Sequence, residues 1–481
     1  MRRIGRWLLV TALLSVLLLC GWRLLPQPSW QQTRPQSTRV ASRDGVLLRL
    51  TLASDERYRL WVPHADYPPQ LIDALLLKEE RWYHWHPGVN PVSVARALAG
   101  RLTDAESDVG ASTLTMQLAR IESGLNTRSY GGKARQMGRA LSISASHDKA
   151  AVLEAYLNLA PMAGNVEGFG TASLVYFGKS AADLNLVEIL TLAVLPQRPQ
   201  LQAHAQGLQL TRFGHAARAR LFDAWVKDHP EHEQFRSQIE AVTVLRRPSD
   251  LPFRAPHAVD QALRTASQRG ALPARLVTTI DLRQQQILER ELARYLDEQA
   301  RMGFRNGSVL LVDAVDGEIR ALVGSADYFD PSISGQINGT AIHRSPGSTL
   351  KPLLYGLAID QGQIHPASVL RDVPTRFGPF SPENFDGEFV GPITAQEALV
   401  RSRNIPAVQI ASRLGQPNLY SLLKAAQVAD MARESHYGLS LVLGGGALSA
   451  QELAGLYGML GRQGRHRRLG LIEGDAARES S

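Results

Sequence analysis

Glu79 is the first residue whose setting indicates chemistry. Leucine and isoleucine residues between positions 71 and 76 recur at helical spacing, and Glu79 continues the same face. Gly88 and two prolines follow soon afterwards, so Glu79 lies near the end of that helix. Apolar surroundings and the negative helix end both disfavour a carboxylate anion, so we expect a raised pKa and proton uptake near neutral pH. The alternative is an ordinary solvated glutamate in the charged run 78–81.

Ser348 and Lys351 form a second chemical pair. They lie one helical turn apart, directly after Pro346 and Gly347, so their side chains can meet. A serine nucleophile needs a base, which a desolvated lysine can be and an arginine cannot. Chance alone gives about 0.5 such pairs in a chain of this composition, so the pair is weak by itself. Ser402 and Asn404, about fifty residues further on, supply the Ser-x-Asn pattern that accompanies such a pair in serine acyl-transfer enzymes.

A third group of residues is suited to an anion. The segment 110–117 reads as a turn that opens a helix, and its hydroxyls and free N–H groups could hold a phosphate. The alternative is simple helix capping. Cationic side chains follow within reach of a pyrophosphate, namely Arg120, Arg128, Lys133 and Arg135.

Composition sets the class of protein. The chain has 481 residues, of which 44% are apolar and 20% charged, and this excludes collagen-like, wholly disordered and many-span membrane proteins. The net charge of +8 favours an anionic partner. One cysteine excludes a disulfide framework and a cysteine-based zinc site.

The N-terminus predicts a membrane anchor. Residues 1–6 carry three arginines and form a cytoplasmic tail, and the apolar residues 7–25 form a transmembrane helix. The alternative is a cleaved signal peptide, but no small-x-small cleavage site follows the run. Residues 26–65 read as a tether with short strands at 46–50 and 58–62. The positive-inside rule places the rest of the chain on the extracytoplasmic side of the cytoplasmic membrane, so we expect no nucleic-acid partner.

Two large domains follow the anchor. Residues 66–225 read as mainly helical, including a helix over 149–159. A linker is predicted over 226–275, and a second domain over 276–481 opens with a β-hairpin at 308–313 and 318–324.

Four blocks of the first domain, in order, resemble the peptidoglycan glycosyltransferase domain of class A penicillin-binding proteins. They are Glu79-Glu-Arg-Trp-Tyr-x-x-His86-x-Gly88, Gly110-Ala-Ser-Thr-x-Thr-x-Gln117, Val152-Leu-Glu-x-Tyr-Leu-Asn158 and Ala172-Ser-x-x-Tyr-Phe-Gly-Lys179. The resemblance covers nearly all of residues 66–200 and implies a lysozyme-like, mainly α-helical fold. It also implies that lipid II is the substrate and the growing glycan strand the partner.

The resemblance assigns roles to individual residues. Glu79 matches the general base that deprotonates the acceptor 4-hydroxyl. The leaving lipid pyrophosphate is strongly anionic, and a divalent cation of the Mg type would neutralise it further. The family's cationic positions match Arg120, Arg128 and Lys133, and its donor-site polar positions match Ser112, Thr113 and Gln117.

Two positions depart from the family pattern. Glu80 stands where aspartate is usual, and Gln136 stands where many relatives have a second glutamate. Glutamine can position a sugar but cannot act as a base. Both residues remain candidate substrate-binding residues, and the segment 132–137 makes the 1C branch the best match.

The second domain resembles a penicillin-binding transpeptidase. Ser348 then matches the acyl-enzyme nucleophile, Lys351 its base, and Ser402 with Asn404 the second wall of a pocket that penicillin would enter. No Lys-Thr-Gly motif occurs in the sequence, and residues 470–481 show no strand pattern. We therefore expect an incomplete domain of the β-lactamase-like fold, C-terminally truncated, poorly stable and impaired in transpeptidation.

The sequence thus predicts a multidomain α plus α/β protein that polymerises lipid II. Three alternatives stay open: a non-catalytic wall-binding scaffold or decayed gene product, a stand-alone DD-peptidase or β-lactamase, and a lytic transglycosylase. The ordered four blocks favour synthesis over lysis, and the absent third motif argues against a stand-alone peptidase.

Overall fold

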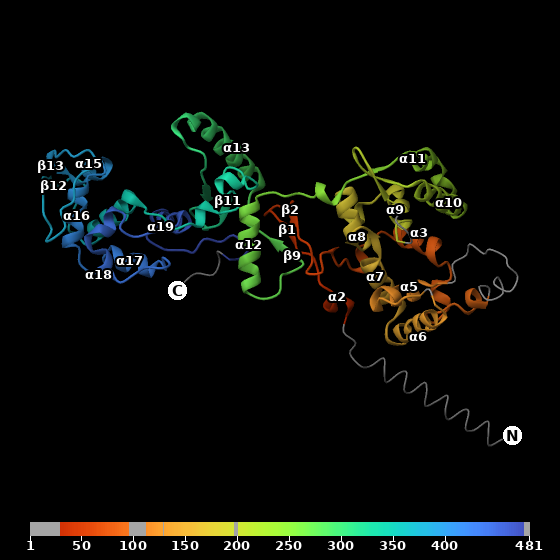
Figure 1. Cartoon of the computed structure of the whole chain (residues 1–481). Coiled ribbons are helices and arrows are strands. Elements are labelled where there is room, and N and C mark those ends of the chain that lie inside the picture. Colours follow the sequence, from red (N-terminus) through yellow and green to blue (C-terminus); the bar gives the residue numbers. More distant parts are fainter. Residues whose placement is uncertain (1–28, 96–111, 128, 197–200, 476–481) are drawn as a thin grey trace, which may run out of the picture. The chain divides into compact units, whose positions relative to one another are not determined.

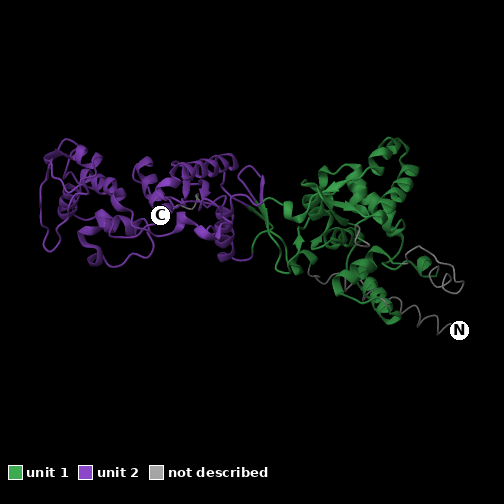
Figure 2. Ribbon diagram, turned by 45° about the horizontal axis from the view of Figure 1, so that its top comes forward, with its two compact units in different colours: residues 1–40, 49–252, 272–276 green, residues 41–48, 253–271, 277–481 purple. Residues whose placement is uncertain are grey.

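A computed structural model describes residues 29–95, 112–127, 129–196 and 201–475. These residues fall into two compact units, drawn from 1–40, 49–252 and 272–276 and from 41–48, 253–271 and 277–481 (Figure 2). The predicted transmembrane helix 7–25 and the candidate Arg128 lie outside the described residues. Within the described ranges, no helix has both the length and the apolar character needed to cross a membrane.

The first unit is mainly helical (Figure 1). Its helices are α2 (Trp30–Thr33), α3 (Pro69–Glu79), α5 (Leu114–Ser123), α6 (Tyr130–Ser146), α7 (Lys149–Leu159), α8 (Phe169–Ala172), α9 (Leu186–Ala193), α10 (Arg212–Asp228) and α11 (Arg236–Glu240). Two small sheets accompany them, with strand orders β3-β5-β4 and β6-β7-β8. Their strands are β3 (Tyr58–Arg59), β4 (Pro161–Ala163), β5 (Val166–Glu167), β6 (Leu201–His204), β7 (Gly207–Leu210) and β8 (Val244–Leu245).

Helix α7 runs through the core of this unit. Seven of its eleven residues are buried, so it is apolar on nearly every side, and α5 packs against it. Helix α3 begins with Pro69 at its first position and buries Leu71 and Leu75 against α9 and α10. The predicted helix over 149–159 and the predicted end of α3 at Glu79 are both confirmed.

The second unit joins a hairpin to a helical region. Strands β10 (Val309–Val312) and β11 (Ile319–Val323) are antiparallel with Val309 opposite Val323, which confirms the predicted hairpin. Helices α12 (Pro256–Gln268) and α13 (Leu282–Gln299) pack against β11, whose five residues are all buried. The helical region contains α14 (Lys351–Asp360), α15 (Ala395–Val400), α16 (Asn404–Arg413), α17 (Leu419–Ala425), α18 (Glu434–Tyr437) and α19 (Ala450–Gly461), with the strand pair β12 (Val369–Asp372) and β13 (Gly391–Thr394). A further sheet has the order β2-β1-β9, from Leu47–Leu50, Arg39–Ala41 and Arg275–Val277.

Two segments were expected to be irregular. Residues 226–275 do not form a linker, because they contain α11, β8 and α12, and α12 buries apolar side chains such as Val259 and Ala262. Residues 470–475 form no strand, in line with their sequence, but Thr279 donates to the Leu471 carbonyl and Ile319 to that of Gly470. Both segments have polar, arginine-rich flanks, so the sequence pattern does not predict the contacts that they make in the tertiary structure.

Candidate functional sites

Glu79 is the last residue of α3 and is half-buried. Its Oε2 accepts a hydrogen bond of 2.7 Å from Nε2 of Gln117, on α5. The hydroxyl of Tyr156, on α7, donates to Oε1 of the same glutamine at 3.2 Å. Tyr156 is fully buried, so the glutamine is oriented from behind and presents its N–H to the carboxylate. Three helices therefore fix the direction in which Glu79 points.

Two of the predicted cations, Arg120 and Lys133, lie near each other on α5 and α6. Nζ of Lys133, on α6, donates to Oγ of Ser112 at 2.6 Å. Burial lowers the pKa of Lys133, and the nearby positive charge of Arg120 lowers it further. Both Glu79 and Arg120 act electrostatically on Tyr156. The structure thus brings Glu79, Gln117, Arg120, Lys133 and Ser112 into one neighbourhood.

Thr113 caps the start of α5. Its Oγ1 accepts a hydrogen bond from the Met116 N–H at 3.1 Å and donates to the Gly88 carbonyl at 2.5 Å. Gly88 has φ of +88°, and a side chain there would stand 2.3 Å from Oγ of Ser144 on α6. Only glycine fits this crossing, which ties the chain after α3 to α5 and α6.

Glu80 is buried, with 8% of its surface exposed. One carboxylate oxygen lies 2.5 Å from Nε2 of His86, and the other accepts a bond of 2.8 Å from the Leu114 N–H at the start of α5. Burial raises the pKa of Glu80 to about 7, against the opposing effect of Lys149. Burial and the charge of Lys149 lower the pKa of His86 to about 4. Because both oxygens of Glu80 have partners inside the protein, we assign it a structural role rather than the predicted contact with substrate.

Gln136 is also in the interior, with 2% of its surface exposed. Its Nε2 donates to the Met116 carbonyl of α5 at 2.6 Å, which joins α6 to α5. Among the described residues its Oε1 has no hydrogen-bond partner. Gln136 therefore joins two helices from the inner face of α6, and its predicted contact with the substrate stays a prediction.

Three residues of this site were missed from the sequence. Tyr156 and His86 are members of the four blocks, but their spacing does not reveal what they contact. Lys149 begins α7 and lies 4.3 Å above the ring of Tyr83. A lysine followed by an apolar helix gives no signal for such a contact.

The second candidate site centres on Lys351, the first residue of α14. Only 1% of its surface is exposed. Its Nζ donates to Oδ1 of Asn404 and to the Ser402 carbonyl, both at 2.6 Å, and lies 3.3 Å from Oγ of Ser402. Burial lowers the pKa of Lys351 to about 8, and the charge of Arg403 contributes. The structure thus brings Lys351 against Ser402 and Asn404, which the family resemblance assigned to a wall of the same pocket.

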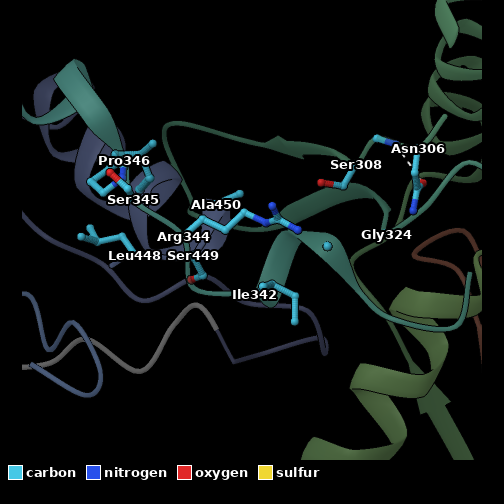
Figure 3. A pocket seen from close by; sticks show the side chains of 13 residues that line it. Asn306, Ser308, Gly324, Ile342, Arg344, Ser345, Pro346, Leu448, Ser449 and Ala450 are labelled. Carbon is cyan, nitrogen blue, oxygen red and sulfur yellow. Dashed lines mark hydrogen bonds between the residues drawn. The ribbon is translucent and has the colours of Figure 1, made fainter. Parts of the chain in front are cut away.

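Ser348 is exposed, in the 3₁₀ turn Gly347–Leu350 that leads into α14. Within the described part of the chain, no hydrogen bond joins Ser348 to Lys351. A cavity of about 490 Å³ opens beside the preceding residues, where Arg344, Ser345 and Pro346 form part of its wall (Figure 3). Ser348 itself is not among the residues that line this cavity.

Comparison with known proteins places both sites in known domains. A family model described as Transglycosylase matches residues 44–220, and a model described as the penicillin binding protein transpeptidase domain matches 307–476. The chain is 37% identical over 477 residues to penicillin-binding protein 1C of Escherichia coli (strain K12), covering 98% of this chain and 60% of that protein. It is 28% identical to penicillin-binding protein 1B of Haemophilus influenzae, covering 89% of this chain and 57% of that protein.

The solved structures agree on the fold. Penicillin-binding protein 1A of Haemophilus influenzae matches with a TM-score of 0.50 and 17% identity, over 92% of this chain and 71% of that chain. The chain spans about 60% of the length of the curated relatives it matches. It belongs to the class A penicillin-binding proteins and is similar to their 1C branch.

Proposed function

We propose that the first unit is a peptidoglycan glycosyltransferase that polymerises lipid II, with Glu79 as its general base. The observation that carries this proposal is the hydrogen bond between Glu79 and Gln117, which Tyr156 orients. Arg120 lies on the same helix as Gln117, and Lys133 lies near Arg120. A half-buried carboxylate with a fixed direction can take a proton from a sugar hydroxyl held against it.

The reaction follows from these positions. Glu79 takes the proton of the acceptor 4-hydroxyl, the oxygen attacks the anomeric carbon of the growing strand, and the lipid pyrophosphate leaves. Arg120 and Lys133 would stabilise the leaving pyrophosphate, and the Ser112 hydroxyl would donate a hydrogen bond to it. Thr113 caps α5 and so holds the start of this helix next to Ser112.

A divalent cation of the Mg type remains part of the proposal. Among the described residues, no group of three or more His, Cys, Asp or Glu side chains could hold a metal ion. Both oxygens of Glu80 are already hydrogen-bonded, so that carboxylate does not offer a ligand. The chemistry such an ion would supply is neutralisation of the phosphate oxygens.

We further propose that residues 7–25 anchor the chain in the cytoplasmic membrane, with both units on the extracytoplasmic side. This rests on the apolar run and the three arginines before it. Such an anchor would hold the first unit where its lipid-linked substrate lies.

Polymerisation of lipid II in detergent tests the base. Glu79→Gln keeps the shape and the bond to Gln117 but cannot accept the proton, so polymerisation should fall by about 10²- to 10⁴-fold. Glu122→Gln, which removes the charge of the half-buried partner of Arg139, is the matched control and should polymerise normally. An unchanged product length distribution for Glu79→Gln would refute the base assignment. A parent protein that binds glycan without polymerising it would favour the scaffold hypothesis, and shortened strands would favour a lytic enzyme.

The bonds of Lys351 favour a second function, acylation of Ser348 by penicillin. A neutral lysine could accept the Ser348 proton while Ser402 and Asn404 hold it in place. Because the sequence contains no Lys-Thr-Gly motif, we expect weak labelling by a fluorescent penicillin. Robust labelling that disappears in Ser348→Ala would show that this motif is dispensable.

A further inference from the structure

The Ser402–Asn404 turn supplies three hydrogen-bond partners of the Lys351 amine. These partners are the Ser402 carbonyl, the Ser402 hydroxyl and Oδ1 of Asn404. Carbonyl and amide oxygens can only accept, so a neutral lysine can receive a hydrogen only from the Ser402 hydroxyl among these three. The geometry of this turn therefore determines where the lysine amine lies and where its lone pair points.

The backbone of the turn does not favour this geometry by itself. Ser402 has φ of +54°, a left-handed conformation that L-residues rarely adopt. Such a conformation persists only where the surrounding structure holds it. The residue that holds it must lie between Ser402 and Asn404 or pack directly against them.

Arg403 stands at that position, and its guanidinium pairs with acidic groups on other segments. It is buried, with 5% of its surface exposed. Its Nε donates to Oδ2 of Asp372 at 2.7 Å and its Nη1 to Oδ2 of Asp386 at 2.8 Å, while its Nη2 donates to the Glu388 carbonyl. Asp372 ends β12 and is completely buried. The guanidinium thus ties the turn to a strand and to a neighbouring loop.

The same loop also holds Asn404. Oδ1 of Asn384 accepts from the Asn404 N–H at 2.8 Å, and Nδ2 of Asn384 donates to Oδ1 of Asp372 at 2.7 Å. Nδ2 of Asn404 donates to the Glu383 carbonyl at 2.7 Å, so its Oδ1 faces Lys351. Asp372, Asn384 and Arg403 therefore form one connected support behind the turn.

We propose that Arg403 is a positioning residue of the Ser348–Lys351 site, whose fork to Asp372 and the 386–388 loop holds the Ser402–Asn404 turn against the lysine amine. This deepens the proposed acylation of Ser348. A lysine in place of Arg403 would keep the charge but could not form the same fork, because it lacks the planar set of donors.

Four variants of the full chain test this role. Arg403→Gln removes the charge and the fork, Arg403→Lys removes only the fork, and Asp372→Asn removes the buried acceptor charge. The matched control is Arg401→Gln, which breaks the exposed pair with Glu397 at the residue directly before the turn. Lipid II polymerisation by the same variants reports separately on the first unit, so a failed glycosyltransferase assay leaves the result on Arg403 intact.

The main readout is the titration of the Lys351 ε-carbon by NMR in protein labelled at lysine. The chain has seven lysines, and Lys351→Arg identifies the signal. We expect the midpoint near pH 8 in the parent and in Arg401→Gln. In Arg403→Gln it should rise by about half a pH unit or more, because a neighbouring positive charge is lost. In Arg403→Lys the midpoint should move less, while the rate of penicillin labelling still falls.

Rescue separates positioning from simple folding. If Arg403→Gln unfolds, Arg403→Lys decides, since it keeps the buried charge paired with Asp372. A Lys351 titration and a labelling rate that match Arg401→Gln in both Arg403 variants would overturn the proposal. A lysine midpoint that shifts with Arg403→Gln and returns with Arg403→Lys, together with slower labelling in both variants, would support it. Should the parent show no labelling, the titration of Lys351 decides. A midpoint that stays at the parent value in both Arg403 variants and in Asp372→Asn would overturn the proposal, and one that shifts in Arg403→Gln and in Asp372→Asn would support it.

Discussion

Replacing Glu80 by Gln should change how the stability of the first unit depends on pH. Glu80 and His86 face each other in the interior at 2.5 Å, beside the start of α5. Burial raises the pKa of the glutamate from 4.5 to about 7, and burial lowers that of the histidine from 6.5 to about 4. The fold therefore favours the uncharged form of each partner. Ionisation of Glu80 lowers the free energy of unfolding at higher pH, and protonation of His86 lowers it at lower pH.

The signs of the two effects are opposite. The glutamate pKa is raised on folding, so its contribution to stability is fully present below pH 4.5 and is lost as the pH rises to about 7. The histidine pKa is lowered, so its contribution is present above pH 6.5 and is lost as the pH falls to about 4. Each shift of 2.5 units corresponds to about 3 kcal/mol, at 1.36 kcal/mol per unit. Between pH 4.5 and 6.5 the two slopes cancel in the parent protein.

The difference between each single variant and the parent isolates the slope of the residue that was replaced. In Glu80→Gln, the free energy of unfolding should rise by about 3 kcal/mol from pH 4.5 to about 7, relative to the parent. In His86→Gln, it should fall by about 3 kcal/mol from about pH 4 to 6.5, again relative to the parent. Taking differences from the parent removes the titration of all other groups.

Urea unfolding followed by tryptophan fluorescence measures these slopes. All seven tryptophans lie at or before position 225, so the signal reports the first unit and not the second. Glu231→Gln replaces an exposed glutamate and should follow the parent at every pH. Difference curves that stay flat for both Glu80→Gln and His86→Gln would show that the pair is not held in its uncharged form, and our reasoning about its burial would be refuted.

Three further outcomes are expected. Tyr156→Phe removes the hydroxyl that orients Gln117, so polymerisation should slow by roughly fivefold, the effect of one hydrogen bond of about 1 kcal/mol, with unfolding measured in parallel. Any penicillin labelling should accelerate about tenfold per pH unit up to a midpoint near pH 8, where Lys351 becomes neutral; a pH-independent rate would exclude it as the base. Glu167→Gln leaves the buried Arg59 with Asp55 as its remaining counter-charge, so urea unfolding should show a loss of about 3 kcal/mol.

Local spacing carried the successful predictions. The position of Glu79 follows from the helical period of the apolar residues before it and from the helix breakers after it. The contact between Lys351 and Ser402, 51 residues apart, does not follow from local spacing, because only the family resemblance placed the two residues in one pocket. At both sites the residue types suit one kind of chemistry, and their order in the sequence matches few other arrangements.

Contacts that depend on which helix face is buried could not be predicted. Gln136 and Glu80 look like substrate ligands in the sequence, because a polar residue in a motif usually faces solvent. In the structure both turn inward, where each completes a bond to the backbone of α5. The role of Arg403, the variable residue of the Ser-x-Asn pattern, could not be predicted either. Its partner Asp372 lies 31 residues earlier, on a strand that carries no motif.

Each candidate base is held by a side-chain amide, but the two amides present opposite ends to their bases. Glu79 receives the N–H of the Gln117 amide, and Lys351 donates to the oxygen of the Asn404 amide. An amide can serve either charge, so something must fix which end it presents. At Gln117 the buried Tyr156 hydroxyl occupies the oxygen, and at Asn404 the Glu383 carbonyl occupies the N–H. The group behind each amide thus selects the charge in front of it, and Gln117→Glu should disable the first site by placing two carboxylates within hydrogen-bond distance while leaving the Lys351 site unchanged.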